Sequence, residues 1–153
     1  MSKQISIFLV LALWIFGSQC EQSKKPISVL NETIFIHTPK VIESQDSETE
    51  FYLFISTERF FPTSGYRIES IFSNKKDSIS IMVLGIKEEN APALQSFMPA
   101  LSYYKIQLPY GDYPLSLIDA AAKGDFNLSV KADTVTISKR ANSSPSNFKI
   151  RGF

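Results

Sequence analysis

Cys20 is the only cysteine of the 153-residue chain, and its thiol is the most readily modified group in the sequence. It follows an apolar run over residues 5–16 (ISIFLVLALWIF), broken only by Ser6 and preceded by Lys3. A short basic start followed by an apolar run of this length is typical of a secretory signal peptide, and the run is too short for a transmembrane helix. Without a second cysteine, Cys20 cannot form an internal disulfide. We therefore predict that residues 1–19 are a cleaved leader and that the thiol is available for modification.

Gly17, Ser18 and Gln19 connect the apolar run to Cys20. This junction resembles the signal of bacterial lipoproteins, in which the cysteine after the leader is acylated. The resemblance implies a palmitate-bearing lipoprotein held at a membrane of the cell envelope, on the periplasmic side or at the surface. Gln19 departs from the usual pattern, in which a small residue precedes the cysteine. Secretion without an anchor, after cleavage near residues 17–20, is the alternative.

The other residues with useful chemistry do not form a catalytic or metal-binding pattern. His37 is the only histidine, and no second histidine or cysteine lies at the spacing of a zinc site. Four carboxylates share a Ser- and Gln-rich stretch without the alternating Asp spacing of a calcium loop: Glu43, Asp46, Glu48 and Glu50. We predict no catalytic residues, no metal and no cofactor, and expect the chain not to be an enzyme. A deep pocket that collects Glu69, Tyr104 and Asp112, with shifted carboxylate pKa values, would favour an enzyme instead.

Two aromatic-rich groups are candidate contact surfaces for a partner, because aromatic rings with polar tips suit protein and ligand contacts. The first is a candidate partner-binding loop between two strong strand patterns: Phe60, Phe61, Pro62, Thr63, Ser64, Gly65 and Tyr66. The second is a candidate aromatic surface: Tyr103, Tyr104, Tyr110 and Tyr113. In each group, burial in the core is the alternative to exposure. A buried Phe pair would close one end of the fold, and about half of the tyrosines should face inward.

The segment Pro62-Thr63-Ser64-Gly65-Tyr66 resembles the Pro-Thr-Gly-Gly-Tyr element of the PrcB C-terminal domain family, which includes exported bacterial proteins associated with a protease complex. It is also similar to the Asn-Pro-Thr-Thr-Gly-Tyr loop of chagasin-type cysteine protease inhibitors, which are immunoglobulin-like sandwiches. The resemblance implies a sandwich fold and a protease as a partner. Phe61 stands where chagasins have Asn, and their Gly-x-Gly-Gly loop is missing from residues 88–99. Their Arg-Pro-Trp loop is missing too, since the only Trp is Trp14 in the leader.

Patterns of period two dominate the chain after the leader and predict short β-strands with one buried face. We expect strands over residues 33–37, 50–57, 65–73, 78–86, 103–108, 113–118, 126–131 and 134–138. The dense apolar run over 50–57 differs from the rest and is typical of a strand covered on both faces. Close turn signals between them favour an all-β fold, an immunoglobulin-like antiparallel β-sandwich of about seven to nine strands, with a barrel as the alternative. At most one short helix is expected, over residues 91–97.

The predicted organisation is a signal peptide (1–19), a tether (20–26), one β-sandwich domain (27–140) and a mobile C-terminal tail (141–153). Lys3 is the only charged residue of the leader, so its removal leaves 15 basic and 15 acidic residues. A neutral domain has no general attraction for nucleic acid. We expect a lipid-anchored envelope protein that acts as a non-enzymatic binding module, with an envelope protein as a partner. A protease inhibitor or protease-complex subunit is the alternative function.

Overall fold

Ten β-strands form all of the regular structure in the described residues of the computed structural model, which are residue 27 and residues 32–89, 96–141 and 146–152. In chain order they are β1 (Ile34–His37), β2 (Lys40–Ser44), β3 (Glu48–Phe61), β4 (Tyr66–Lys75), β5 (Ser78–Glu88), β6 (Met98–Pro109), β7 (Gly111–Ile118), β8 (Lys123–Lys131), β9 (Thr134–Lys139) and β10 (Phe148–Arg151). The all-β prediction is confirmed, with one strand more than the expected upper number. The described ranges hold no helix that could cross a bilayer.

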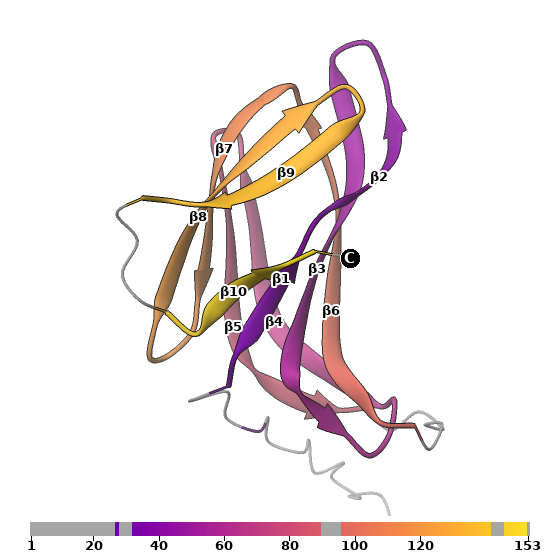
Figure 1. The fold of residues 1–153 in the computed structure, drawn as a ribbon, viewed down its shortest axis with the longest axis vertical. Coiled ribbons are helices and arrows are strands. Elements are labelled where there is room, and N and C mark those ends of the chain that lie inside the picture. Colours follow the sequence, from indigo (N-terminus) through magenta and orange to yellow (C-terminus); the bar gives the residue numbers. More distant parts are fainter. Residues whose placement is uncertain (1–26, 28–31, 90–95, 142–145, 153) are drawn as a thin grey trace, which may run out of the picture.

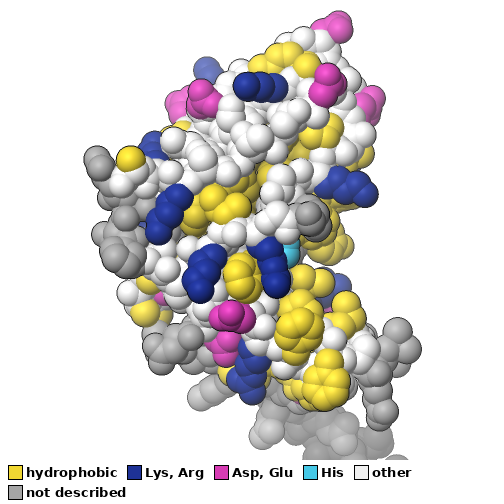
Figure 2. All heavy atoms as spheres, viewed as in Figure 1, with side chains coloured by type: hydrophobic (Ala, Val, Ile, Leu, Met, Phe, Trp, Pro, Cys, Tyr) yellow, Lys and Arg dark blue, Asp and Glu magenta, His cyan; other side chains and the backbone are white. Residues whose placement is uncertain are grey.

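The strands form one curled sheet in the order β10-β1-β3-β6-β4-β5-β7-β8-β9, and β2 pairs with β3 outside this path. The sheet bends around the core until its edge strands β9 and β10 lie near one another, which gives a barrel-like β-sandwich (Figure 1). Most neighbours are antiparallel, whereas β1 with β10, β4 with β6 and β5 with β7 are parallel. Figure 2 shows side chains of both charges on one face, as the balanced composition leads us to expect.

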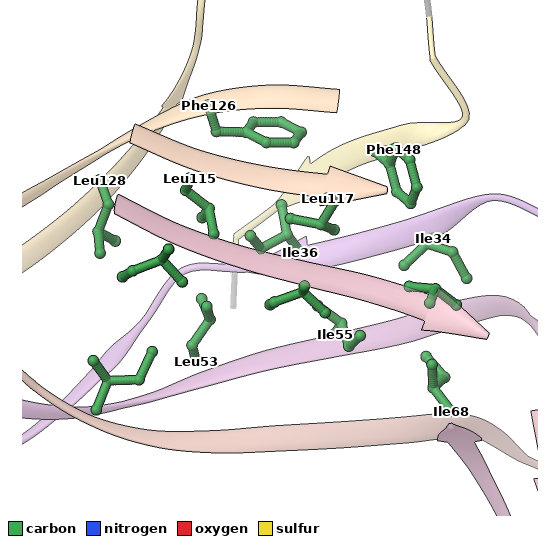
Figure 3. Packing of buried hydrophobic residues seen from close by; sticks show 14 of the residues in the cluster. Ile34, Ile36, Leu53, Ile55, Ile68, Leu115, Leu117, Phe126, Leu128 and Phe148 are labelled. Atoms are coloured by element: carbon green, nitrogen blue, oxygen red, sulfur yellow. The ribbon is translucent and has the colours of Figure 1, made fainter. Parts of the chain in front are cut away.

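The core follows from the period-two patterns, because alternate side chains of a strand point to opposite faces of a sheet. Phe51, Leu53 and Ile55 of β3 are fully buried. Figure 3 shows Leu53 and Ile55 pointing toward side chains from the facing strands, Leu115 and Leu117 of β7 among them. Full burial of one such side chain stabilises the fold by about 1.5–3 kcal/mol. This interior is the main source of stability in a domain without disulfides.

The C-terminal segment is part of the sheet. Phe148–Arg151 form β10, which pairs in parallel with β1, and the Phe148 side chain is only 1% exposed. The Asn147 side chain donates hydrogen bonds to the Glu32 carbonyl at 2.7 Å and to Asp119 Oδ2 at 3.1 Å. The expectation of a mobile tail over residues 141–153 is thus wrong for Phe148–Arg151, because Phe148 completes the core. Residues 142–145 lie outside the described residues.

Two other expectations fall partly outside the described ranges. The expected helix over 91–97 includes residues 91–95, which the structure does not describe, and Phe97 itself is not helical. The expected leader and tether, residues 1–26, also lie outside. The first described residue, Ile27, forms an isolated antiparallel bridge with Ile86 of β5.

A wide bulge interrupts the pairing of β3 with β6. Ser56 is opposite Leu101 and Phe60 is opposite Pro99, so residues 57–59 lie opposite Ala100 alone. The buried Thr57 hydroxyl replaces the missing ladder contacts: it accepts a hydrogen bond from the Ala100 N–H at 3.0 Å and donates one to the Arg59 carbonyl at 2.8 Å. The Thr57 side chain therefore supports the bulge, together with the Glu58 N–H, which donates to the Thr33 carbonyl at 2.9 Å.

Thr57→Val should lower the free energy of unfolding by about 1–3 kcal/mol, because it leaves the buried Ala100 N–H without an acceptor at nearly constant side-chain volume. Urea denaturation measures the change. Thr136→Val, at an exposed position of β9, is the matched control and should stay within about 0.5 kcal/mol of wild type. Equal stability of wild type and Thr57→Val would contradict the role of the hydroxyl.

Candidate functional site

The candidate loop is shorter than predicted, because Phe60 and Phe61 are the last two residues of β3. As neighbours on a strand they point to opposite faces. Phe61 is 3% exposed and belongs to the core, whereas Phe60 is 57% exposed. Both readings of this aromatic pair thus hold, each for one residue: Phe61 closes the end of the fold and Phe60 projects into solvent.

Ring contacts and a backbone hydrogen bond hold the turn after β3 in place. The Phe61 and Tyr66 rings stack with centroids 4.5 Å apart, and the Arg59 guanidinium lies 5.2 Å from the Phe61 centroid. The carbonyl of buried Gly65 accepts a hydrogen bond of 2.6 Å from the Glu89 N–H, which connects the turn to the end of β5. Between these supports, Pro62 and Ser64 are exposed and Thr63 is half-buried.

The four candidate tyrosines do not share one surface. Tyr103 and Tyr104 are adjacent on β6, so Tyr103 faces solvent and Tyr104 faces the interior side of the sheet. The Tyr104 ring stacks on Phe72 with centroids 4.8 Å apart, and its hydroxyl is hydrogen-bonded to Ser70. Tyr104 is therefore a packing residue between β6 and β4.

The other two tyrosines fix the turn between β6 and β7. Tyr110 donates a hydrogen bond of 2.6 Å to the Gln45 carbonyl, and the buried Tyr113 donates one of 2.9 Å to the Pro109 carbonyl. Burial, with smaller contributions from nearby carboxylates, raises the pKa of the Tyr113 phenol, so it remains a donor. Of the predicted set, Tyr103 is the most exposed, at 59%, whereas Tyr110 is 40% exposed and has its hydroxyl bound to the Gln45 carbonyl.

Tyr103 instead belongs to a cluster that the sequence did not indicate. Its ring centroid lies 6.1 Å from that of Tyr52 and 6.2 Å from that of Phe54, and those two are 5.9 Å apart. Tyr52 and Phe54 are half-buried, and Tyr103 is 59% exposed. We call these three residues the aromatic face. Beside it, Lys105 and Glu50 form an ion pair of 2.9 Å.

The aromatic face lies on the outer side of β3 and β6, the side opposite the core residues Phe51 and Leu53. In Figure 2, hydrophobic side chains gather beside His37, the single cyan residue, with Lys and Arg side chains among them. Exposed apolar patches that are bordered by charged residues are typical of interaction surfaces.

A hollow of about 450 Å³ adjoins the aromatic face where β4 and β6 separate. The two strands are paired only at Arg67 opposite Leu101. The hollow is lined by Ser64, Tyr66, Arg67, Met98, Pro99, Leu101, Ser102 and Tyr103. It therefore combines part of the candidate loop with the start of β6.

A second hollow of about 330 Å³ shares Arg67 and Ser102 with the first and includes Glu69 and Tyr104. Asp112, the third residue of the enzyme alternative, lies on β7 opposite Ser129 and does not line it. The three residues of that alternative are thus not collected in this hollow.

Two carboxylates of the acidic stretch predicted from the sequence contact side chains of β6. Glu50 pairs with Lys105, and Glu48 Oε2 accepts a hydrogen bond of 2.7 Å from Gln107. In the parts of the chain that the structure describes, no three His, Cys, Asp or Glu side chains are grouped as metal ligands.

His37 ends β1, with its Nε2 2.8 Å from the Ser56 hydroxyl. Burial lowers the pKa of the imidazole below its ordinary value, and the positive charge of Arg151 lowers it further. The folded state therefore favours neutral His37.

Because the pKa of His37 is lower in the folded than in the unfolded chain, its contribution to stability is present above the unfolded value of about 6.5 and is lost as the pH falls from there through the lower folded-state pKa. The melting temperature should thus decrease between about pH 7.5 and pH 5.5. His37→Gln keeps a hydrogen-bonding group without the titration and should reduce this decrease. An unchanged pH dependence in His37→Gln would contradict the assignment.

Comparison with known proteins gives no relative for this chain: no family model, no curated protein and no solved structure matches it. The likeness to bacterial lipoproteins and to the PrcB and chagasin families therefore stays a prediction.

Proposed function

We propose that this chain is an exported, lipid-anchored envelope protein that acts as a non-enzymatic binding module and contacts a protein partner through the aromatic face. The leader pattern and the lone Cys20 support export and anchoring. The observation that carries the binding role is the exposed Tyr103 ring, which is held in a fixed position by Tyr52 and Phe54.

The aromatic face has the properties of a contact centre between proteins. Tyr is enriched among the residues that dominate binding energy, and a ring already fixed by neighbours loses little conformational entropy on binding. The nearby Lys105 and Glu50 pair supplies the polar border that such centres usually have. A partner that covers Tyr103 would bury most of a large apolar side chain.

Site-specific crosslinking in cells tests this role. A photoreactive benzoyl-phenylalanine in place of Tyr103 should give one discrete crosslinked species on illumination. The same group in place of Ile71, which is 55% exposed on β4, is the matched control and should give none. No discrete species at position 103, or the same species at both positions, would contradict the proposed face.

Protease inhibition is the second candidate function, because the turn presents exposed Phe60, Pro62 and Ser64 on a rigid base. In this case Phe60→Ala should weaken inhibition of a papain-type protease by the purified protein. Phe61 would not serve as the test residue, since its replacement would disturb the core. If wild-type protein leaves such proteases fully active, the inhibitor proposal fails.

A further inference from the structure

One end of the molecule carries a cluster of exposed apolar side chains that the aromatic face does not include. Phe97 is 77% exposed and is the most exposed large apolar residue of the described chain. It is accompanied by exposed Phe60 at the end of β3 and by the exposed residues of early β6. We call this cluster the apolar rim: Ile27, Phe60, Phe97, Met98 and Leu101.

A series of backbone contacts places Ile27 at the same end as the rest of the apolar rim. Ile27 exchanges two hydrogen bonds with Ile86 near the end of β5, of 2.7 and 2.9 Å. The Glu89 N–H, just beyond β5, donates to the Gly65 carbonyl in the turn that follows β3.

Phe61, the last residue of β3, is opposite Met98, the first residue of β6. Figure 1 shows the ends of β3 and β5 and the starts of β4 and β6 together at the lower end of the fold. The point where the chain enters the sheet and the apolar rim therefore share one end.

The length of chain before Ile27 limits how the domain can sit on a membrane. Six residues lie between Cys20 and Ile27, and the seven steps from Cys20 to Ile27 can span at most about 25 Å. The 14 residues of β3 extend over about 46 Å. An anchor at Cys20 would therefore hold the end with the apolar rim nearest to the bilayer and keep the opposite end away from it.

We propose that the apolar rim docks on the lipid bilayer to which Cys20 is anchored, with Phe60 and Phe97 in the interfacial region. The inference rests on the proposed lipid anchor and adds a second contact that orients the domain. Phe side chains insert at the boundary between headgroups and acyl chains, so Phe60 and Phe97 would add a contact that fixes the orientation of a domain already held by its anchor.

Two arginines near the apolar rim are paired with carboxylates. Arg67 pairs with Glu89 at 3.0 Å, and Arg59 lies 3.7 Å from Glu32. Because these two cations have carboxylate partners, the apolar rim itself should dock mainly through apolar contact. Lys24 and Lys25 precede Ile27 and would add attraction to anionic lipids, so neutral phosphatidylcholine vesicles isolate the contribution of the rim. A docked rim would leave the tip of the domain, around β2, in solvent.

The test measures the fluorescence of a single introduced tryptophan, since the sequence after the leader contains none. The probe is the mature chain, residues 20–153, whose strands and core all lie within residues 34–151. Its single cysteine is coupled to a maleimide lipid in phosphatidylcholine vesicles, so that anchoring does not depend on cellular acylation. Phe97→Trp reports from the apolar rim, and Ile42→Trp reports from an exposed site on β2.

We expect the emission of Phe97→Trp to shift to shorter wavelength on coupling and to be quenched by brominated lipids, whereas Ile42→Trp should show neither effect. Adding Phe60→Ala to Phe97→Trp should reduce the quenching, and adding Ile71→Ala should not. Circular dichroism confirms that each variant is folded.

Absence of quenching in Phe97→Trp, or equal quenching at positions 97 and 42, would overturn rim docking and leave the anchor proposal standing. An unmodified Cys20 in the protein isolated from cells would overturn the anchor proposal and leave the vesicle result standing. The two failures are therefore distinguishable.

Discussion

Phe148→Ala should lower the free energy of unfolding by about 3–5 kcal/mol, the usual cost of removing a buried aromatic ring. Phe148 is 1% exposed, and its ring lies among the core residues although it comes from the last strand (Figure 3). Packing around it is tight: a Cβ added to Gly124 would lie 3.0 Å from Phe148 and from Phe126. The large expected loss follows because closely packed neighbours relax only partly into the cavity that the missing ring leaves.

Urea denaturation of the two proteins measures this loss. Ile150→Ala is the matched control, since Ile150 lies on the same strand and is exposed. It should cost well under 1 kcal/mol, as most exposed substitutions do. If Phe148→Ala is no more destabilising than Ile150→Ala, then β10 does not complete the core, and the segment behaves as the tail that the sequence suggested.

Cys20→Ser should release the protein from membranes. A serine hydroxyl cannot replace the thiol as the acceptor of the diacylglyceryl group, and membrane affinity increases by about 0.8 kcal/mol for each buried CH₂ of an acyl chain. Loss of the chains therefore removes most of the binding energy, and what the apolar rim supplies alone is small. Fractionation and detergent-phase partitioning should find wild type in the membrane and Cys20→Ser in the soluble or unprocessed fraction.

Gln19→Ala is the control for this experiment, because it places a small residue before the cysteine and keeps the thiol. It should remain in the membrane fraction and be processed at least as completely as wild type. Wild type in the soluble fraction would instead favour secretion without an anchor.

The sequence predicted the strands with alternating or continuous apolar patterns and missed the two short strands β2 and β10. The expected strands over 126–131 and 134–138 correspond closely to β8 and β9. One face of each strand is buried and the other is exposed to solvent, so the residues alternate clearly. β10 was missed because its four residues follow a polar low-complexity segment and are too few to establish a period. Its position beside β1 is a contact between distant parts of the chain, which local patterns do not encode.

The candidate site was predicted only in part, because a pattern gives the period of a strand and not the face that each residue takes. Because Tyr103 and Tyr104 are neighbours on one strand, their side chains must point to opposite faces of the sheet, and the sequence alone allows this inference. Tyr52 and Phe54 were hidden in a continuous apolar run that indicates a strand buried on both faces. Their side of β3 is partly exposed because no second layer of the described residues packs against it, which is a property of the whole sheet.

The central claim is that the chain is exported and held at a membrane through Cys20, and mass spectrometry of the mature N-terminus tests it most directly. The account predicts a first residue Cys20 that carries a diacylglyceryl group, with residues 1–19 removed. An N-terminus that retains the leader, or a mature protein with an unmodified Cys20, would contradict it.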